Sequence, residues 1–206
     1  MINPWLKISA SDYVNHMSSL EVMQYQMINE CFKTALDKYR PQKILVPGCT
    51  IGNGFEHINW TQVEKVTALD INENYLQILR QNYGYHKNLE VVVKDIVQFN
   101  SNKKYDLIFA ALLFEYVDLR STLKKIKEFM SENSVLYTII QLQNKKVSMI
   151  SKTKYKSLEQ LSSIMKLVNV QEFYLAANVI GLKILSEKKI TLKSGKSFQV
   201  FEINSI

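Results

Sequence analysis

Short apolar runs that alternate with helix-like segments constrain the fold of this chain more than any other feature. A short, continuous apolar run is typical of a strand whose two faces are both buried, as in a parallel sheet. The chain has five such runs, at 43–47, 65–70, 89–95, 105–112 and 134–142. Segments with helical spacing of apolar residues lie before and among them, at 20–39, 72–83 and 121–130. This alternation predicts an α/β fold with a mostly parallel sheet.

The ends of the predicted helices are also marked in the sequence. Arg40-Pro41 ends the first helix, because a proline disfavours helical geometry in the residue before it. Asn72 and Ser121 are expected to cap the next two helices, since short polar side chains accept hydrogen bonds from the first free backbone N–H groups.

The pattern changes after residue 142. Helices are expected over 157–168 and 169–181, the second capped by its first residue, an asparagine, and closed by its last, a glycine. Two alternating runs, 182–192 and 197–206, are joined by KSGK and predict a β-hairpin. The sequence therefore predicts a three-layer, Rossmann-like α/β sandwich. Its sheet should have seven strands, mostly parallel, with one antiparallel strand.

The stretch KILVPGCTIGNG (43–54) leads from the first predicted strand into three glycines. In a parallel sheet, ligands bind beyond the carboxyl ends of the strands, where this loop lies, and glycines let a backbone approach a ligand closely. Asp70 ends the second strand 22 residues after Gly48, and a carboxylate there can accept hydrogen bonds from two ribose hydroxyls. Asp95 ends the third strand, within reach of a purine edge. These positions predict a nucleoside-containing cofactor.

The spacing of the glycines argues against a dinucleotide. A dinucleotide-binding loop reads G-x-G-x-x-G, because its second glycine makes room for the pyrophosphate. Here Gly48, Gly52 and Gly54 leave Thr50 where that second glycine would be. A dehydrogenase is therefore the least favoured enzyme class.

Four stretches, ILVPGCTIGNG, VTALDINENYL, VVVKDI and YDLIFAALLFEYVD, resemble in order and spacing the motifs of class I S-adenosylmethionine-dependent methyltransferases. The resemblance covers about residues 40–142, and the terminal runs GLKIL and KITLKSGKSFQVFEI are similar to the antiparallel sixth and seventh strands of that fold. SDYVNHM (11–17) and TKYKSLEQL also resemble segments of small bacterial methyltransferases without an assigned substrate. The resemblance implies S-adenosylmethionine as the cofactor and S-adenosylhomocysteine as its product.

The resemblance also implies a cofactor site and a division of the chain. The cofactor-binding residues would be Gly48, Cys49, Gly52, Asp70, Ile71, Asp95, Ile96, Ala110 and Ala111. The single domain, 1–206, would comprise an N-terminal lid segment (1–20), a cofactor-binding core (40–142) and substrate-side helices with the terminal hairpin (143–206).

Two positions depart from the family pattern. Val46 stands where the family usually has an acidic residue near the ammonium group of the cofactor, and Thr50 stands where it usually has glycine. Backbone carbonyls or Glu56 are expected to replace the missing acidic contact. Because of these departures, a methyltransferase-fold protein that binds a cofactor or partner without turnover is one alternative.

Candidate residues for the acceptor side occur in three places, because a hydroxyl or protonated amine acceptor also needs a proton acceptor. In DYVNHM, Tyr13, His16 and Met17 have helical spacing and are expected to form a lid, with His16 as a candidate base. The alternative is a solvated cap with one tyrosine docked on the core.

The other two places follow the fourth and fifth predicted strands. Glu115 and Tyr116 are expected near the point of methyl transfer, and Glu115 is a second candidate base; the alternative is a carboxylate favoured by a helix dipole. Tyr155, in TKYKS, is a candidate wall of the acceptor site, with a plain surface loop as the alternative. The candidate catalytic residues are therefore His16, Glu115 and Tyr116.

The distribution of charge bears on whether the acceptor is a nucleic acid or a small molecule. Residues 1–119 carry 11 Lys and Arg against 13 Asp and Glu, whereas residues 120–206 carry 15 against 6. A basic half can indicate a nucleic-acid partner, but three of the 26 basic residues are arginine, the preferred residue for bidentate phosphate recognition. A small-molecule acceptor is therefore expected, with an RNA methyltransferase as the alternative.

Location and metal content are predicted from what the sequence lacks. No apolar run approaches the roughly 20 residues of a membrane helix, and the N-terminus has no apolar signal core, so a cytoplasmic protein is expected. Two distant cysteines and three dispersed histidines form neither a disulfide framework nor metal-ligand spacing, and no metal is expected.

Overall fold

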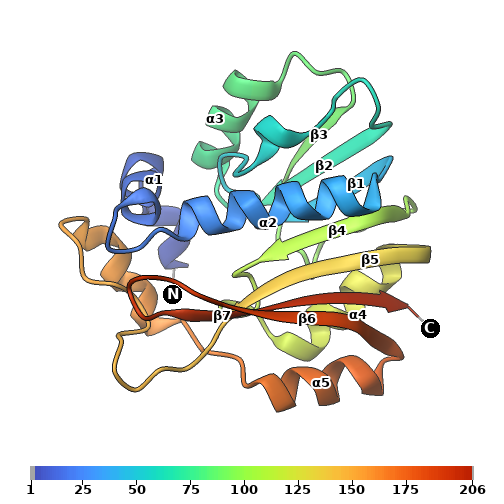
Figure 1. Ribbon diagram of the computed structural model, residues 1–206. Helices are drawn as coiled ribbons and strands as arrows, with labels where there is room; N and C mark the ends of the chain where they lie inside the picture. Colours follow the sequence, from blue (N-terminus) through green and yellow to red (C-terminus); the bar gives the residue numbers. More distant parts are fainter. Residues whose placement is uncertain (1–2, 206) are drawn as a thin grey trace.

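The computed structural model describes residues 3–205, which are built around one seven-stranded sheet (Figure 1). The strand order is β3-β2-β1-β4-β5-β7-β6. Strands β1 to β5 run parallel, and β7 pairs antiparallel with both of its neighbours, which confirms the predicted sheet. The strands are β1 (Lys43–Pro47), β2 (Lys65–Asp70), β3 (Leu89–Val93), β4 (Tyr105–Ala111), β5 (Met130–Gln141), β6 (Leu182–Thr191) and β7 (Ser197–Ser205).

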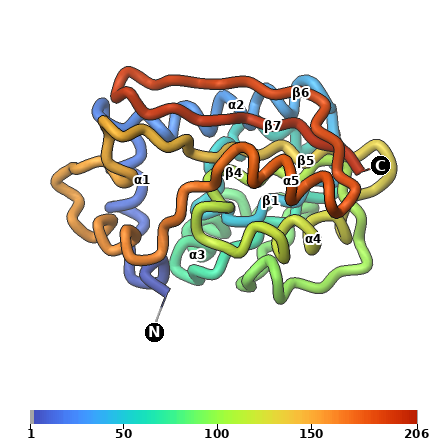
Figure 2. Tube along the Cα trace, turned by 90° about the horizontal axis from the view of Figure 1, so that it is seen from below, coloured from blue at the N-terminus to red at the C-terminus, as the bar shows by residue number. Residues whose placement is uncertain are grey.

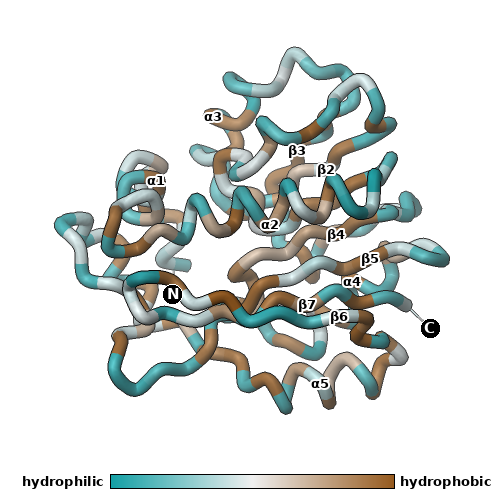
Figure 3. The backbone as a smooth tube through the Cα atoms, viewed as in Figure 1, coloured by the Kyte–Doolittle hydropathy of each residue, from teal (hydrophilic) through white to brown (hydrophobic). Residues whose placement is uncertain are grey.

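Helices cover both faces of this sheet, so that three layers form (Figures 1 and 2). Alternate residues of each strand point to opposite faces. In β1, Ile44 and Val46 belong to the core under α2 and α3, whereas Leu45 belongs to the core under α4 and α5. Hydrophobic residues are accordingly concentrated in the strands (Figure 3). The α-helices are α1 (Ala10–Ser18), α2 (Gln24–Tyr39), α3 (Glu73–Tyr83), α4 (Leu119–Phe129) and α5 (Val170–Val179).

The predicted helix over 20–39 begins later than expected, and a separate helix precedes it. Helix α1 ends at Ser18, and the backbone N–H and the hydroxyl of Ser19 both donate to the carbonyl oxygen of His16. Met23 then has a φ of 50°, in the left-handed region, so the chain turns before α2 begins. This turn lets α1 lie beyond the end of β4 rather than along the axis of α2 (Figure 1).

The helix predicted over 157–168 is shorter than expected: it is the 3₁₀ helix η3 (Lys156–Ser163), followed by irregular chain. The buried residues Leu158 and Leu161 are three apart, which matches the three residues of a 3₁₀ turn. The hydroxyl of Ser162 donates to the carbonyl oxygen three residues earlier, which competes with α-helical hydrogen bonding.

Two predicted caps are confirmed and one is wrong. Asn72 and Asn169 accept hydrogen bonds from the first turns of α3 and α5 through their side-chain oxygens. Helix α4 is capped by Asp118 instead of Ser121, because the Asp118 carboxylate accepts from the Ser121 N–H at 2.9 Å. The helix therefore begins two residues earlier than predicted.

Candidate functional site

The loop after β1 is tied to the end of β2 by backbone hydrogen bonds. The N–H groups of Gly48 and Cys49 both donate to the carbonyl oxygen of Leu69, at 2.8 and 3.2 Å. Gly48 has a φ of 69°, which glycine adopts without the steric cost of a Cβ. Thr50 also has a positive φ, 51°, and its N–H donates to Asp70 Oδ2 at 2.9 Å. This hydrogen bond helps a threonine hold a conformation that normally favours glycine.

Asp70 is the buried carboxylate at the end of β2, with 8% of its surface exposed. Its Oδ2 accepts from the Thr50 N–H and its Oδ1 accepts from the Asn72 N–H, each at 2.9 Å. Burial raises the pKa of Asp70, and the backbone N–H groups oppose that rise. A carboxylate offers about four lone-pair sites, so each oxygen can still accept a hydrogen bond from a ligand.

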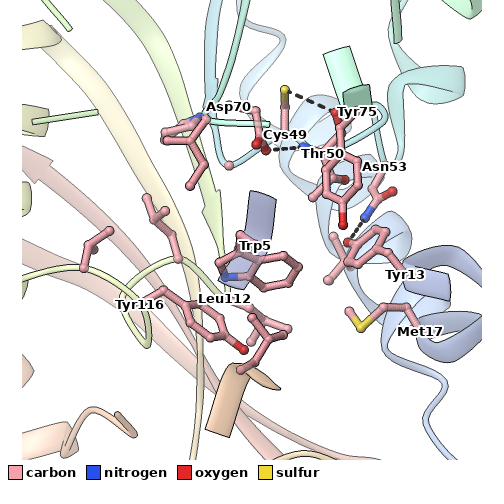
Figure 4. Close-up of a pocket in the computed structure, with 18 of the residues that line it drawn as sticks. Trp5, Tyr13, Met17, Cys49, Thr50, Asn53, Asp70, Tyr75, Leu112 and Tyr116 are labelled. Atoms are coloured by element: carbon pink, nitrogen blue, oxygen red, sulfur yellow. Dashed lines mark hydrogen bonds between the residues drawn. The ribbon is translucent and has the colours of Figure 1, made fainter. Parts of the chain in front are cut away.

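A cavity of about 170 Å³ lies beside this loop, at the carboxyl ends of β1, β2 and β4 (Figure 4). Seven of the predicted cofactor-binding residues line it: Gly48, Cys49, Asp70, Ile71, Asp95, Ile96 and Ala111. They lie at the carboxyl ends of four strands, β1 to β4, or in the loops that follow them, so the fold brings together residues up to 63 positions apart in the sequence.

The other two predicted cofactor residues do not line the cavity. Gly52 faces the rings of Tyr83 and Phe55, since a Cβ added to it would lie 3.2 and 3.3 Å from them. Ala110 is fully buried in the core with α4 and α5, because neighbouring residues of a strand point to opposite faces. Of the two alanines, Ala111 alone lines the cavity.

The N-terminal segment covers the cavity with aromatic and thioether side chains (Figure 4). Tyr13, His16 and Met17 of α1 all line it. The Tyr13 hydroxyl accepts from Asn53 Nδ2 at 2.6 Å, which joins α1 to the loop after β1. Its ring centroid lies 5.7 Å from that of Tyr75 in α3.

Trp5 is a cavity residue that sequence reasoning missed. It belongs to the 3₁₀ helix η1 (Pro4–Lys7), and its ring packs edge-on against Tyr116, with centroids 5.1 Å apart. Asn72 Nδ2 donates to its carbonyl oxygen at 2.8 Å, so the side chain that caps α3 also holds η1. A tryptophan close to the N-terminus was the available signal, but the sequence does not show which surface it contacts.

Two of the three candidate catalytic residues line the cavity. Tyr116 lies there against Trp5, and burial raises its pKa well above the ordinary value. The ring of His16 is 4% exposed, and its Nδ1 lies 2.9 Å from Thr153 Oγ1. Burial, with a contribution from the positive charge of Lys196, lowers the pKa of His16 to about 4. His16 is therefore neutral near pH 7.

The third candidate, Glu115, does not line the cavity. Its carboxyl group is buried, and Oε1 accepts from the backbone N–H of Gln141 at 2.5 Å. The side chain therefore links the loop after β4 to the end of β5, and burial raises its pKa to about 7. Tyr155 does not line the cavity either; it packs at the edge of the core shared with α2 and α3.

Several polar atoms at the cavity are buried and have no partner among the described residues. They are Gln24 Nε2, Thr50 Oγ1, Asn53 Oδ1 and Tyr75 OH. A buried polar group without a partner costs about 1–3 kcal/mol, so these atoms favour a polar ligand in the cavity.

Val46 lines the cavity, so the position at which the family usually has an acidic residue carries no carboxylate. Glu56, the expected replacement, accepts from Asn29 Nδ2 at 2.8 Å and does not line the cavity, so this expectation is corrected. The oxygens of Thr50 and Asn53 are the unpartnered acceptors near this position.

Residues 3–205 contain neither a cluster of potential metal ligands nor a helix that could span a membrane. Groups of three or more His, Cys, Asp or Glu side chains that could hold a metal do not occur in that part of the chain. Nor is any helix there long and apolar enough to cross a membrane.

Part of this chain is similar in sequence to known methyltransferases. Residues 45–138 match the family described as a methyltransferase domain. Malonyl-[acyl-carrier protein] O-methyltransferase 1 of Ilyobacter polytropus is 35% identical to this chain over 54 residues, which are 26% of this chain and 20% of that protein. The chain thus matches about a fifth of the length of that relative.

The comparison with solved structures extends over most of the chain. The N-methyltransferase NodS from Bradyrhizobium japonicum WM9, in complex with S-adenosyl-L-homocysteine, has a TM-score of 0.66 at 12% identity over 88% of this chain and 87% of that one. The [4+2]-cyclase SpnF has a TM-score of 0.68 at 7% identity, over 86% and 81%. At such identities the likeness concerns the fold alone. The chain therefore matches the methyltransferase-domain family over residues 45–138 and has the Rossmann-like fold of these solved structures.

Proposed function

We propose that this protein transfers a methyl group from S-adenosylmethionine to a small-molecule acceptor and releases S-adenosylhomocysteine. The observation that carries the proposal is the pairing of Asp70 with the Gly48 loop at one end of a covered cavity. The family match over residues 45–138 supports the same conclusion.

The residues at the cavity fit this cofactor. Asp70 has free lone pairs for two ribose hydroxyls, and Ile71 and Ile96 offer apolar surface to the adenine. The unpartnered oxygens of Thr50 and Asn53 suit an ammonium group, and the unpartnered Gln24 Nε2 suits a carboxylate. The amino-acid end of the cofactor carries both groups.

The bound cofactor would supply a methyl group that its sulfonium has already activated for in-line displacement. The chain must then orient the acceptor and exclude water. Trp5, Tyr13 and Met17 cover the cavity and would exclude water (Figure 4). The small side chain of Ala111 lines the cavity at the end of β4. His16 is neutral near pH 7, so a ring nitrogen can accept a hydrogen bond from the acceptor, whereas its pKa of about 4 makes it a weak base.

The covered cavity favours a small molecule over RNA as the acceptor. Trp5 packs on Tyr116, and Tyr13 is joined to Asn53, so the N-terminal segment lies where a polynucleotide would have to enter. We therefore assign residues 1–20 the role of a lid, 40–142 that of the cofactor-binding core, and 143–206 that of the acceptor side. Cys31 and Cys49 are free thiols, which supports a reducing compartment such as the cytoplasm.

Calorimetric titration with S-adenosylhomocysteine and with NAD tests this proposal. We expect saturable binding of S-adenosylhomocysteine and none of NAD. Asp70→Asn should weaken S-adenosylhomocysteine binding by at least tenfold, since a hydrogen bond to a charged group contributes about 1.5–3 kcal/mol and about 1.4 kcal/mol is tenfold. Asp37→Asn, which changes an exposed carboxylate on α2, is the control. Equal affinities of the two folded variants would refute the placement of the cofactor.

A further inference from the structure

Lys196 is a buried lysine that the proposed transfer does not yet use. It lies where the hairpin turns from β6 into β7, and 3% of its surface is exposed. It lines the cavity, together with His16, Gln141 and Met149. Its Nζ donates to the carbonyl oxygen of Met149 at 2.6 Å. An ammonium group has three N–H donors, so two of them have no recorded acceptor among residues 3–205.

The surroundings of Lys196 lack a compensating negative charge. Burial alone lowers its pKa, to about 8, and no neighbouring carboxylate opposes that effect. The carboxylates on the cavity wall are Asp70 and Asp95, both in the part that we assign to the cofactor. Each already accepts backbone hydrogen bonds in its own loop. A buried charge without a partner is costly, and lysine is therefore rarely buried unless it is paired.

The neighbouring groups support an anion at this end of the cavity. His16 is neutral near pH 7, so Lys196 is the cation of this region. Gln141 Nε2 donates to the same Met149 carbonyl oxygen at 2.9 Å, so this oxygen is shared by two donors and compensates the charge of Lys196 less well. The same cavity is also lined by the buried apolar side chains of Leu158, Leu161 and Met165.

We propose that Lys196 binds a carboxylate group of the acceptor, which is therefore an apolar organic acid. Lys94, the other lysine on the cavity wall, follows β3 beside Asp95, in the part that we assign to the cofactor, and no arginine lines the wall. A single lysine at the acceptor end matches the single charge of a carboxylate better than the double charge of a phosphate. This inference rests on the proposed function only in calling the ligand an acceptor, because the anion site itself is a property of the cavity.

Nuclear magnetic resonance of the full-length protein with ¹³C at the lysine Cε tests this proposal, with benzoate and benzamide as probes of equal shape. We expect benzoate to move the Lys196 signal saturably and to raise the pKa of Lys196, since an adjacent negative charge stabilises the ammonium form. Benzamide should do neither. Absence of a saturable shift with benzoate, or an equal shift with benzamide, would overturn the proposal.

Two variants make the assignment specific. Lys196→Met should weaken benzoate binding by about ten- to a hundredfold, the range expected for a hydrogen bond to a charged group. Lys193→Met, which changes an exposed lysine of the same turn, should leave it unchanged. If Lys196→Met does not fold, the titrations of the wild type with benzoate and benzamide still test the proposal. The titrations are run with and without S-adenosylhomocysteine, so failure of cofactor binding is seen separately from failure of the anion site.

Discussion

Replacement of Glu115 by glutamine should make the stability of this protein less dependent on pH. Glu115 is 1% exposed; its Oε1 accepts from the Gln141 N–H, and its Oε2 has no partner among the described residues. Burial raises its pKa from 4.5 to about 7. A carboxyl group with a raised pKa in the folded state favours folding while it is protonated. That contribution is fully present below pH 4.5 and is lost as the pH rises through about 7.

The size of this loss follows from the pKa change. Each pKa unit corresponds to about 1.4 kcal/mol, so ionisation of buried Glu115 costs roughly 3 kcal/mol of unfolding free energy. This is a large part of the roughly 5–15 kcal/mol that stabilises a typical domain. Glutamine keeps an oxygen that can accept from the Gln141 N–H but cannot ionise. Relative to the wild type, Glu115→Gln should therefore gain about 3 kcal/mol between pH 4.5 and pH 8.

Urea unfolding followed by circular dichroism at a series of pH values measures this difference. Glu132→Gln, which changes an exposed glutamate of β5, is the matched control and should follow the wild-type curve. Parallel stability curves for wild type and Glu115→Gln would refute the argument. The variant should also bind S-adenosylhomocysteine as tightly as the wild type, because Glu115 does not line the cavity.

Other predictions concern the lid, the basic half of the chain and His16. Removing residues 1–18 should weaken S-adenosylhomocysteine binding far more than it lowers global stability, because Trp5 and Tyr13 cover the cavity. Calorimetry measures the loss of affinity, and thermal unfolding measures the loss of stability. The basic region 120–206 should not bind unrelated RNAs tightly, and submicromolar binding at physiological salt with a steep salt dependence would contradict this. The lowered pKa of His16 means that stability is lost as the pH falls from 6.5 towards about 4. His16→Gln should reduce that loss in urea unfolding; an unchanged acid limb would show that His16 is not buried in neutral form.

The strands of this protein are largely determined by local sequence. The ranges predicted for β1 and β2, 43–47 and 65–70, agree with the structure because a strand buried on both faces must be continuously apolar. The parallel sheet, its antiparallel strand and the place of Asp70 at a carboxyl end follow from the order of elements. Several residues that line the cavity could therefore be predicted from their positions in the chain.

What the sequence could not determine depends on contacts between distant segments. Ala110 and Ala111 are equivalent in the sequence, and the direction of each side chain is settled only when β4 pairs with its neighbours. Glu115 was predicted to face the ligand, but the end of β5 supplies the backbone N–H that holds its carboxylate.

The proposed lid and the proposed anion site depend on such contacts even more strongly. Trp5 reaches the cavity because Asn72 holds its carbonyl oxygen and Tyr116 offers a ring, and neither partner is near it in the sequence. In the sequence, Lys196 looks like one of many solvated lysines. The fold shows otherwise, because the turn between β6 and β7 places it against Met149. Sequence periodicity therefore determined the layers and the cofactor end of the cavity, because those depend on local apolar spacing. Tertiary packing alone decided which side chains close the cavity, because their burial depends on partners brought together only by the fold.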